Sequence, residues 1–145
     1  MFMRTFTVVL TLIVLGVASS CKKNETSYFP SVAFEQRVYL SNPSSFDLSV
    51  PGGWIYTDGG YKGLIIYRRY LNGGQDDFIA LDRGCPTHYS ESCATLKTTS
   101  DDLFAKCDCN NEKYLLFDGA PSEGASLGMR QYQVIRNGDV LYISN

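Results

Sequence analysis

The sequence predicts an all-β domain, and three observations support this fold class. From about Tyr28 onward apolar residues recur with a period of two, which is the period of a strand with one buried face. No window in that part of the chain keeps apolar residues at helical spacing for ten or more positions. Glycine pairs beside Pro, Asp or Asn separate the apolar runs, as is typical of turns between strands. We therefore expect an antiparallel β-sandwich or β-barrel.

The first 20 residues are typical of a signal peptide. Arg4 precedes an apolar run over residues 6–17, and the small residues Ala18-Ser19-Ser20 follow it. This run is shorter than the ~20 residues that a helix needs to cross a bilayer. The residues before Cys21 are similar to a bacterial lipobox, so we expect cleavage at this point and acylation of Cys21. Ordinary secretory cleavage, with Cys21 left as a free thiol, is the alternative.

Residues 21–28 are expected to form a lipidated Cys and a flexible polar spacer, followed by a single β domain over 29–145. Several acyl chains on one Cys anchor a protein stably to a membrane. Lys22 follows Cys21, where an Asp would resemble an inner-membrane retention signal. We therefore expect a bacterial cell-envelope protein at the outer membrane rather than the inner one. The expected partners are the membrane, through the lipid, and an envelope protein or glycan.

Three apolar runs predict the first strands. Two of them are marked by residues of one parity, namely Val32, Phe34, Val38 and Leu40, and then Phe46, Leu48 and Val50. The third run, residues 64–67, is continuously apolar and predicts a buried central strand.

The turn signals predict where strands end. Asn137-Gly138 between the apolar runs 132–135 and 140–143 predicts a hairpin with a type I′ turn. Three charge pairs lie beside turn residues, and we expect them on solvated loops or strand edges: Arg68-Arg69, Asp76-Asp77 and Asp101-Asp102.

Composition and charge exclude several functions. The chain has 145 residues, with 13 Lys+Arg and 15 Asp+Glu, and it contains no basic run, so we expect no nucleic-acid partner. It has a single His, His88, as a possible imidazole base, which argues against hydrolytic catalysis. We expect no enzymatic activity.

Four cysteines follow Cys21 within one 25-residue stretch: Cys85, Cys93, Cys107 and Cys109. An exported protein meets an oxidising compartment, which favours disulfides over free thiols. Four cysteines permit three pairings, and their spacing does not select one of them.

The stretch from Cys85 to Tyr114 resembles the Rieske domain, in which two loops at the tip of a β-fold hold a [2Fe–2S] cluster with two Cys and two His ligands. Cys85 and Cys107 match the thiolate ligands, and His88 matches the first imidazole. Asn110 stands where the family has its second His. The resemblance covers roughly residues 52–143 and is closest to Rieske-like lipoproteins of Bacteroidetes-type bacteria.

The resemblance, combined with the single His of the chain, implies a fold that is retained and a cluster that is lost. Cys93 and Cys109 match a disulfide pair found in respiratory-chain members of the family. Loss of the metal would leave Cys85 near Cys107, which implies a second disulfide. We therefore expect no cofactor, no metal and no catalytic residue, and a structural or binding role.

Three alternatives remain at this point. The first is electron transfer through an atypical [2Fe–2S] cluster held by Cys85, His88 and Cys107. The second is thiol–disulfide exchange at Cys107-Asp108-Cys109, although the Asp108 carboxylate disfavours a reactive thiolate. The third is a zinc site, whose spacing matches no common pattern.

Overall fold

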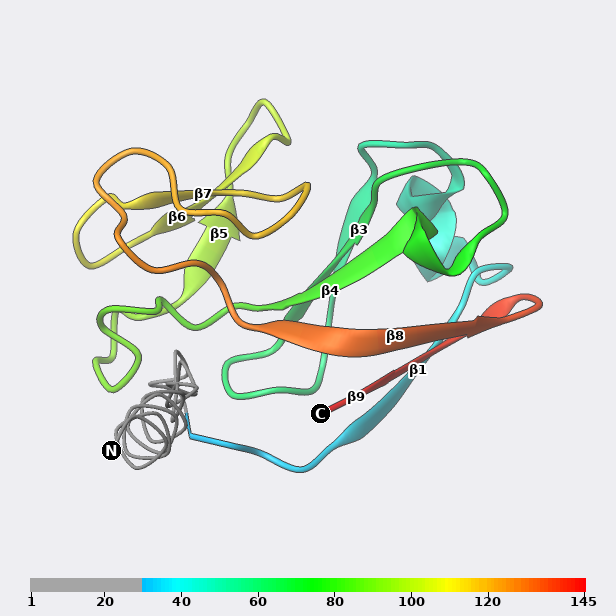
Figure 1. Ribbon diagram of the computed structural model, residues 1–145, viewed down its shortest axis with the longest axis horizontal. Helices are drawn as coiled ribbons and strands as arrows, with labels where there is room; N and C mark the ends of the chain where they lie inside the picture. Colours follow the sequence, from blue (N-terminus) through cyan, green and yellow to red (C-terminus); the bar gives the residue numbers. More distant parts are fainter. Residues whose placement is uncertain (1–29) are drawn as a thin grey trace, which may run out of the picture.

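The computed structural model describes residues 30–145 (Figure 1). The expected signal peptide over 1–20 and the lipidated Cys and spacer over 21–28 lie outside these residues. The described part contains the strands β1 Glu35–Tyr39, β2 Trp54–Thr57, β3 Leu64–Arg68, β4 Phe78–Asp82, β5 Leu96–Thr98, β6 Phe104–Cys107, β7 Lys113–Leu115, β8 Gln131–Asn137 and β9 Val140–Ser144. Two 3₁₀ helices accompany them, η1 Pro43–Ser49 and η2 Gln75–Asp77. Within residues 30–145, no helix has the length and apolar character needed to span a membrane.

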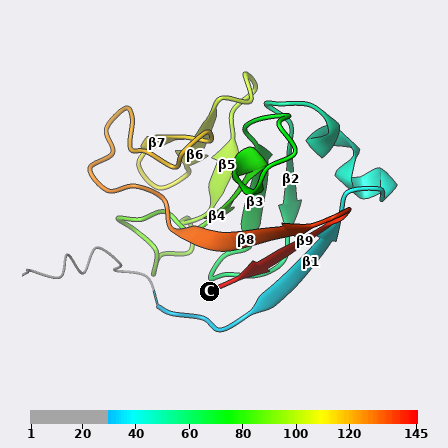
Figure 2. The ribbon, with the colours of Figure 1, turned by 45° about the vertical axis from the view of Figure 1, so that its right-hand side comes forward.

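The strands form two antiparallel sheets. A six-stranded sheet has the order β1-β9-β8-β4-β3-β2, and a three-stranded sheet has the order β5-β6-β7. The small sheet lies at one end of the molecule, where the chain leaves β4 and later returns to β8 (Figures 1 and 2). The predicted all-β, antiparallel fold class is confirmed.

β3 and β4 are neighbouring interior strands of the large sheet and are buried on both faces. One apolar cluster lies between the two sheets and includes Ile65, Tyr67, Ile79 and Leu81. The other cluster lies against β1, β8, β9 and η1, and it includes Leu64, Ile66, Phe78 and Ala80. Successive side chains of a strand point to opposite faces, so a strand with a core on each side is apolar throughout. The central strand predicted over residues 64–67 is confirmed.

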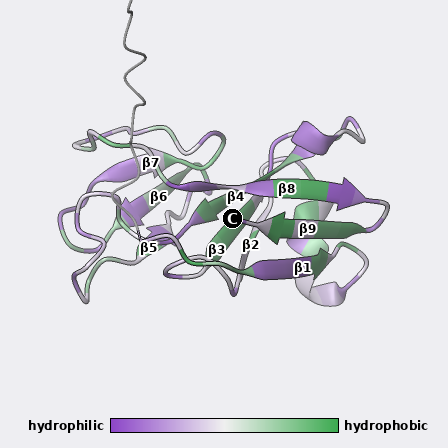
Figure 3. Ribbon diagram, turned by 60° about the horizontal axis from the view of Figure 1, so that its bottom comes forward, coloured by the Kyte–Doolittle hydropathy of each residue, from purple (hydrophilic) through white to green (hydrophobic). Residues whose placement is uncertain are grey.

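The first predicted strand is present, and its even-numbered positions face inward. Val38 is buried, whereas Glu35, Arg37 and Tyr39 are exposed. β1 is accordingly mostly hydrophilic in colour in Figure 3, while β9 beside it is apolar.

The strand predicted from Phe46, Leu48 and Val50 is wrong, because these residues lie in or just after η1. Pro43 occupies the first turn of η1, where its missing N–H leaves no bond unmade. With three residues per turn, Ser45 and Leu48 face the core, and Phe46 is 74% exposed. A short apolar run in which only Leu48 points inward is compatible with the two-residue period of a strand and with the three-residue turn of a 3₁₀ helix.

The hairpin predicted near the C-terminal end is confirmed, but its turn type is not. Asn137 pairs with Val140, which leaves Gly138 and Asp139 as a two-residue loop. A type I′ turn needs positive φ at both loop residues, and here only Gly138 has it, at 58°. Glycine accepts positive φ without steric cost, whereas the side chain of Asp139 disfavours it, so the loop has the pattern of a type II′ turn.

Two members of the charge pairs expected on the surface are buried instead. Arg68 is 7% exposed and Asp77 is 1% exposed. Nη2 of Arg68 lies 3.7 Å from Oδ2 of Asp77. Other guanidinium nitrogens of Arg68 donate to the carbonyl oxygens of Leu48 at 2.7 Å and Tyr70 at 2.9 Å. These partners are spread along the chain, so neighbouring residues gave no sign of the burial.

The Asp77 carboxylate remains charged because its surroundings compensate for its burial. Burial alone would raise its pKa. The backbone N–H groups of Asn72 and Gly73 donate to it at 3.1 and 2.9 Å, and the guanidinium groups of Arg68 and Arg136 lie nearby. Together they hold the pKa of Asp77 below its ordinary value.

Candidate functional site

The four cysteines of the described part lie on two loops that converge at the small sheet (Figure 1). The first cysteine loop, residues 83–95, connects β4 to β5, and the second, residues 108–112, follows Cys107 at the end of β6 and connects β6 to β7. A bridge between Gly84 and Thr95 closes the base of the first loop. The N–H of Cys107 donates to the carbonyl of Glu112 at 2.9 Å and closes the second. We call residues 83–115, which comprise both loops and the small sheet, the tip.

Two disulfides join the two loops. Cys85 is bonded to Cys107 and Cys93 to Cys109, with Cα separations of 5.8 and 5.2 Å. The first pair has no exposed surface and belongs to the apolar cluster between the sheets. The second pair is partly exposed. The Sγ atoms of Cys85, Cys107 and Cys109 lie within 4.8 Å of one another, so a buried disulfide and an accessible one lie side by side.

A polar network connects the loops beside the disulfides. Nδ2 of Asn110 lies 3.1 Å from Nδ1 of His88. The Asn110 side-chain oxygen accepts the N–H of Glu112 at 3.1 Å, which directs the amide nitrogen toward His88. Oγ1 of Thr87 lies 2.8 Å from the same His88 nitrogen and donates to the Glu112 carboxylate at 2.6 Å. Nδ1 of His88 is therefore engaged by side chains from both loops.

The carboxylate of Glu112 is the centre of this network and is 9% exposed. Burial opposes its charge, but hydrogen bonds from Thr87, Tyr114 and Asn110 outweigh that cost and hold its pKa below the ordinary value of 4.5. The Tyr114 hydroxyl donates to it at 2.6 Å. Burial, together with this carboxylate, raises the pKa of Tyr114 well above its ordinary range. At neutral pH Glu112 is thus charged and Tyr114 is neutral.

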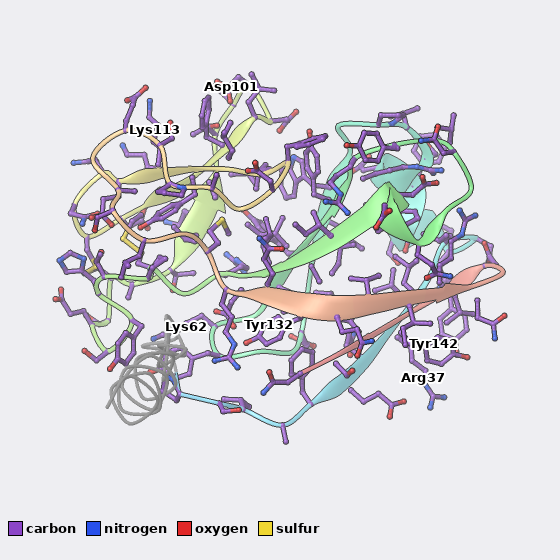
Figure 4. The ribbon with its side chains drawn as sticks, in the orientation of Figure 1. Arg37, Lys62, Asp101, Lys113, Tyr132 and Tyr142 are labelled. Atoms are coloured by element: carbon purple, nitrogen blue, oxygen red, sulfur yellow. A yellow bond between two sulfur atoms is a disulfide. The ribbon has the colours of Figure 1, made fainter. Side chains whose placement is uncertain are left out.

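Asp82, the last residue of β4, fixes the start of the first cysteine loop and has no exposed surface. Its carboxylate accepts the N–H groups of Tyr61 and Gly84, each at 2.6 Å, and the Tyr132 hydroxyl at 2.8 Å. A Cβ on Gly60, whose φ is +62°, would lie 2.5 Å from the same carboxylate, so this turn requires glycine. Figure 4 shows Tyr132 beneath this end of the large sheet, near Lys62.

Three contacts attach the tip to the edge strand β2. Nε1 of Trp54 donates to the Asp102 carboxylate at 2.8 Å. The N–H of Thr98 donates to the Tyr56 hydroxyl at 2.9 Å. The Arg83 guanidinium lies 3.8 Å from the centre of the Tyr56 ring. The predicted surface position of the charge pair at 101–102 is confirmed, because both residues are exposed on the β5–β6 turn (Figure 4).

The residues of the tip do not fit the cluster that the resemblance implies. A Rieske-type cluster needs two thiolates and two imidazoles. Cys85 and Cys107 lie together, but their sulfurs are bonded to each other, so neither is a thiolate. The side-chain oxygen of Asn110 already accepts the N–H of Glu112. His88 belongs to neither group of metal-ligating atoms that residues 30–145 bring within 4.8 Å. The same lack of thiolates argues against zinc.

The structure also bears on the exchange alternative. Cys107 and Cys109 are not bonded to each other, because each is paired with a cysteine of the first loop. Nζ of Lys97 lies 2.6 Å from the Asp108 carboxylate between them. Both side chains are exposed, so the ion pair is weak, but the cation offsets part of the negative field that Asp108 places near the sulfurs.

Thr87, Glu112, Tyr114 and Asp82 are parts of the site that the sequence did not reveal as such. Glu112 and Tyr114 are two positions apart beside a strand, a spacing that puts both side chains on one face. Asp82 directly follows a buried apolar run, where a carboxylate is unusual. These two signals are visible in the sequence, whereas the partners of each group come from distant segments.

An exposed groove of about 600 Å³ lies along η1 and the start of β2. Its lining includes Phe46, Val50, Trp54 and Asp102. Phe46 and Val50 are among the exposed large apolar side chains of the described residues. Exposed apolar groups around an aromatic ring are typical of a surface that meets another molecule.

No family model and no curated protein matches the sequence. Solved structures similar to the chain include the following three. The cyanobacterial plasma membrane Rieske protein PetC3 from Synechocystis PCC 6803 has a TM-score of 0.48 and 14% identity, over 63% of this chain and 85% of that one. The ferredoxin of carbazole 1,9a-dioxygenase from Nocardioides aromaticivorans IC177 has a TM-score of 0.46 and 19% identity, over 78% and 97%. A protein named as an NADH-dependent nitrite reductase small subunit, from Mycobacterium tuberculosis, has a TM-score of 0.44 and 10% identity, over 79% and 97%.

Proposed function

We propose that the protein is a lipid-anchored lipoprotein of the bacterial cell envelope, whose Rieske-like domain has lost its iron–sulfur cluster and has a structural or binding role rather than an enzymatic one. The motif resemblance around Cys85 and Cys107 supports the family, and the donor set of the tip supports the loss of the cluster. The signal sequence before Cys21 supports the anchor and the outer-membrane location.

One observation carries the proposal: Cys85 and Cys107, which match the cluster thiolates, form a fully buried disulfide. A cluster would hold the two loops together through these residues, and the disulfide holds them together without metal. In the chain-entropy model, cross-links over separations of 22 and 16 residues each contribute about 3 kcal/mol to stability. The two disulfides thus replace the mechanical role of a cluster but not its electron transfer.

The test of the lost cluster is the metal content of protein produced with iron and sulfide in excess and purified without oxygen. We expect a colourless protein with background iron and sulfide, identical in this respect to a Cys85→Ser variant. A coloured protein with stoichiometric iron and sulfide, both lost in Cys85→Ser, would instead establish electron transfer through an atypical [2Fe–2S] cluster.

The anchor is tested by growth on a labelled fatty acid. We expect the label on the cleaved chain that begins at Cys21 and the protein in the outer-membrane fraction, whereas a Cys21→Ser variant carries no label. An unlabelled wild-type chain would refute the anchor.

For the binding role we propose the groove beside Phe46 and Trp54. Its exposed apolar and aromatic side chains can pack against an apolar patch of an envelope protein or against the C–H face of a glycan ring.

A further inference from the structure

The two disulfides of the tip differ in accessibility and lie within reach of each other. Cys93 and Cys109 are partly exposed, so a dissolved thiol can approach this disulfide from solvent. Cys85 and Cys107 have no exposed surface, so the same thiol cannot reach theirs. The Sγ of Cys109 lies within 4.8 Å of both buried sulfurs. The accessible disulfide therefore lies between solvent and the buried one.

We propose that the tip is a two-disulfide relay, in which a small-molecule thiol opens Cys93–Cys109 and the released Cys109 thiolate then opens the buried Cys85–Cys107 bond. Disulfides exchange by attack of a thiolate on one sulfur, with the other sulfur leaving as a thiolate. The second attack is intramolecular, and a nucleophile held beside its target reacts at a very high effective concentration. Through the relay, electrons from a dissolved thiol can reach a disulfide that is buried in the core.

Charge near the accessible disulfide determines which sulfur leaves. The Glu91 carboxylate oxygen lies 3.5 Å from Sγ of Cys93 and within 4.8 Å of Sγ of Cys109, so it disfavours negative charge on both sulfurs and most on that of Cys93, which it contacts. Near Cys109 the exposed Asp108 carboxylate is paired with Lys97. We therefore expect the external thiol to form a mixed disulfide with Cys93 and the negative charge to leave on Cys109.

The external thiolate bonds to Cys93 and releases Cys109 as a thiolate, which then bonds to Cys85 and releases Cys107. A second external thiolate attacks the external sulfur of the mixed disulfide and releases Cys93. Two external thiols are oxidised to one disulfide, one protein disulfide is reduced, and Cys93 and Cys107 take up the two protons.

Attack on Cys85 rather than Cys107 keeps the tip cross-linked. A bond between Cys107 and Cys109 would close a strained ring over Asp108 alone and would leave the two loops unjoined. A bond between Cys85 and Cys109 still joins the first cysteine loop to the second. The tip can therefore store two electrons without losing its covalent link, which is compatible with a structural role.

The relay is tested by partial reduction of the full chain with glutathione, under nitrogen and with a chelator present. The reaction is quenched with acid, free thiols are alkylated, and the modified cysteines are located by mass spectrometry. We expect alkylation at Cys93 and Cys107, and a peptide pair linked through Cys85 and Cys109. Alkylation at Cys93 and Cys109 with Cys85–Cys107 intact would overturn the proposal, as would the absence of any reduction.

Two variants that each lack only the accessible disulfide provide a matched control. In Cys93→Ser the free Cys109 lies beside the buried disulfide, so alkylation is expected at both Cys109 and Cys107 without any added thiol. In Cys109→Ser the free Cys93 is not within reach, so alkylation is expected at Cys93 alone. Equal patterns in the two variants, with the buried disulfide intact in both, would contradict the relay even if both fold.

Discussion

The large sheet and the tip of this protein are stabilised in different ways. In the large sheet, β3 and β4 are buried along their whole length, with an apolar cluster on each face. In the tip, the strands have only three or four residues, and the described cysteines and the Glu112 network all lie there or in the adjoining loops. The tip contributes buried apolar residues to the cluster between the sheets, but its strands are short, so covalent links and specific polar contacts add to its order.

The difference explains how the chemistry of the tip can change while the fold persists. The apolar clusters against β3 and β4 include contributions from the tip, but most of the large sheet is held by residues far from the cysteines. Substitution of a metal ligand therefore affects local order first. A disulfide in its place restores the link between the loops.

The largest expected effect breaks the large sheet. Ile66 has no exposed surface, and Ile66→Ala removes buried volume from the cluster against β8 and β9. We expect the free energy of unfolding to fall by about 2–5 kcal/mol. The loss should be the same with and without a reducing agent, because no disulfide borders this cluster, and denaturant titration measures it. A loss that disappears on reduction would contradict the separation of the two regions.

The next effect is confined to the tip. The double variant Cys85→Ala, Cys107→Ala removes the buried disulfide, and we expect a loss of about 3 kcal/mol. Amide hydrogen exchange should accelerate in β5, β6 and β7 more than in β3 and β4. Cys93→Ala with Cys109→Ala is the matched control for the partly exposed pair. Uniform acceleration across both sheets would show that the tip is not an independent unit.

A third prediction concerns pH. The pKa of Glu112 is lower in the folded protein than the ordinary value of 4.5. The unfolded chain therefore binds a proton more readily, so the carboxylate stabilises the fold above about pH 4.5 and this contribution is lost as pH falls through the folded pKa. Glu112→Gln should cost about 1–3 kcal/mol at neutral pH and flatten the acid dependence.

Thermal unfolding between neutral and acid pH measures this dependence. Glu91→Gln, at an exposed position of the first cysteine loop, is the control and should leave it unchanged. An unchanged acid profile in Glu112→Gln would remove the carboxylate from the account of the tip.

The smallest effect sharpens the boundary between the regions. Trp54→Phe keeps an aromatic ring on β2 but removes the donor to Asp102. We expect a loss of about 0.5–1.5 kcal/mol, seen as faster hydrogen exchange in the β5–β6 hairpin. Phe46→Ser, in the exposed groove, should change stability by less than about 0.5 kcal/mol. A larger effect from Phe46→Ser would mean that the groove is part of the core.

Features of the fold that depend on local pattern could be predicted from the sequence. The central strand over 64–67 and the hairpin around Gly138 rest on contiguous residues, and both are present. The 3₁₀ helix η1 was missed because one inward residue, Leu48, fits two periods. The burial of Arg68 and Asp77 was missed because each is compensated by partners distant in the chain.

In the candidate site, too, the features that rest on a local motif could be predicted, whereas those that depend on distant partners could not. The convergence of two cysteine loops and the position of Asn110 opposite His88 come from the motif resemblance, and the structure places them together. The roles of Thr87 and Glu112 as links between the loops depend on side-chain geometry, which no spacing in the sequence encodes.

The most direct test of the central claim is disulfide mapping of the full chain, isolated without oxygen and alkylated before digestion. We expect two cross-linked peptide pairs, Cys85 with Cys107 and Cys93 with Cys109, and no alkylation at any of the four. Four alkylated cysteines, in a sample that also carries stoichiometric iron and sulfide, would show that the tip holds a cluster and that the disulfides do not replace it.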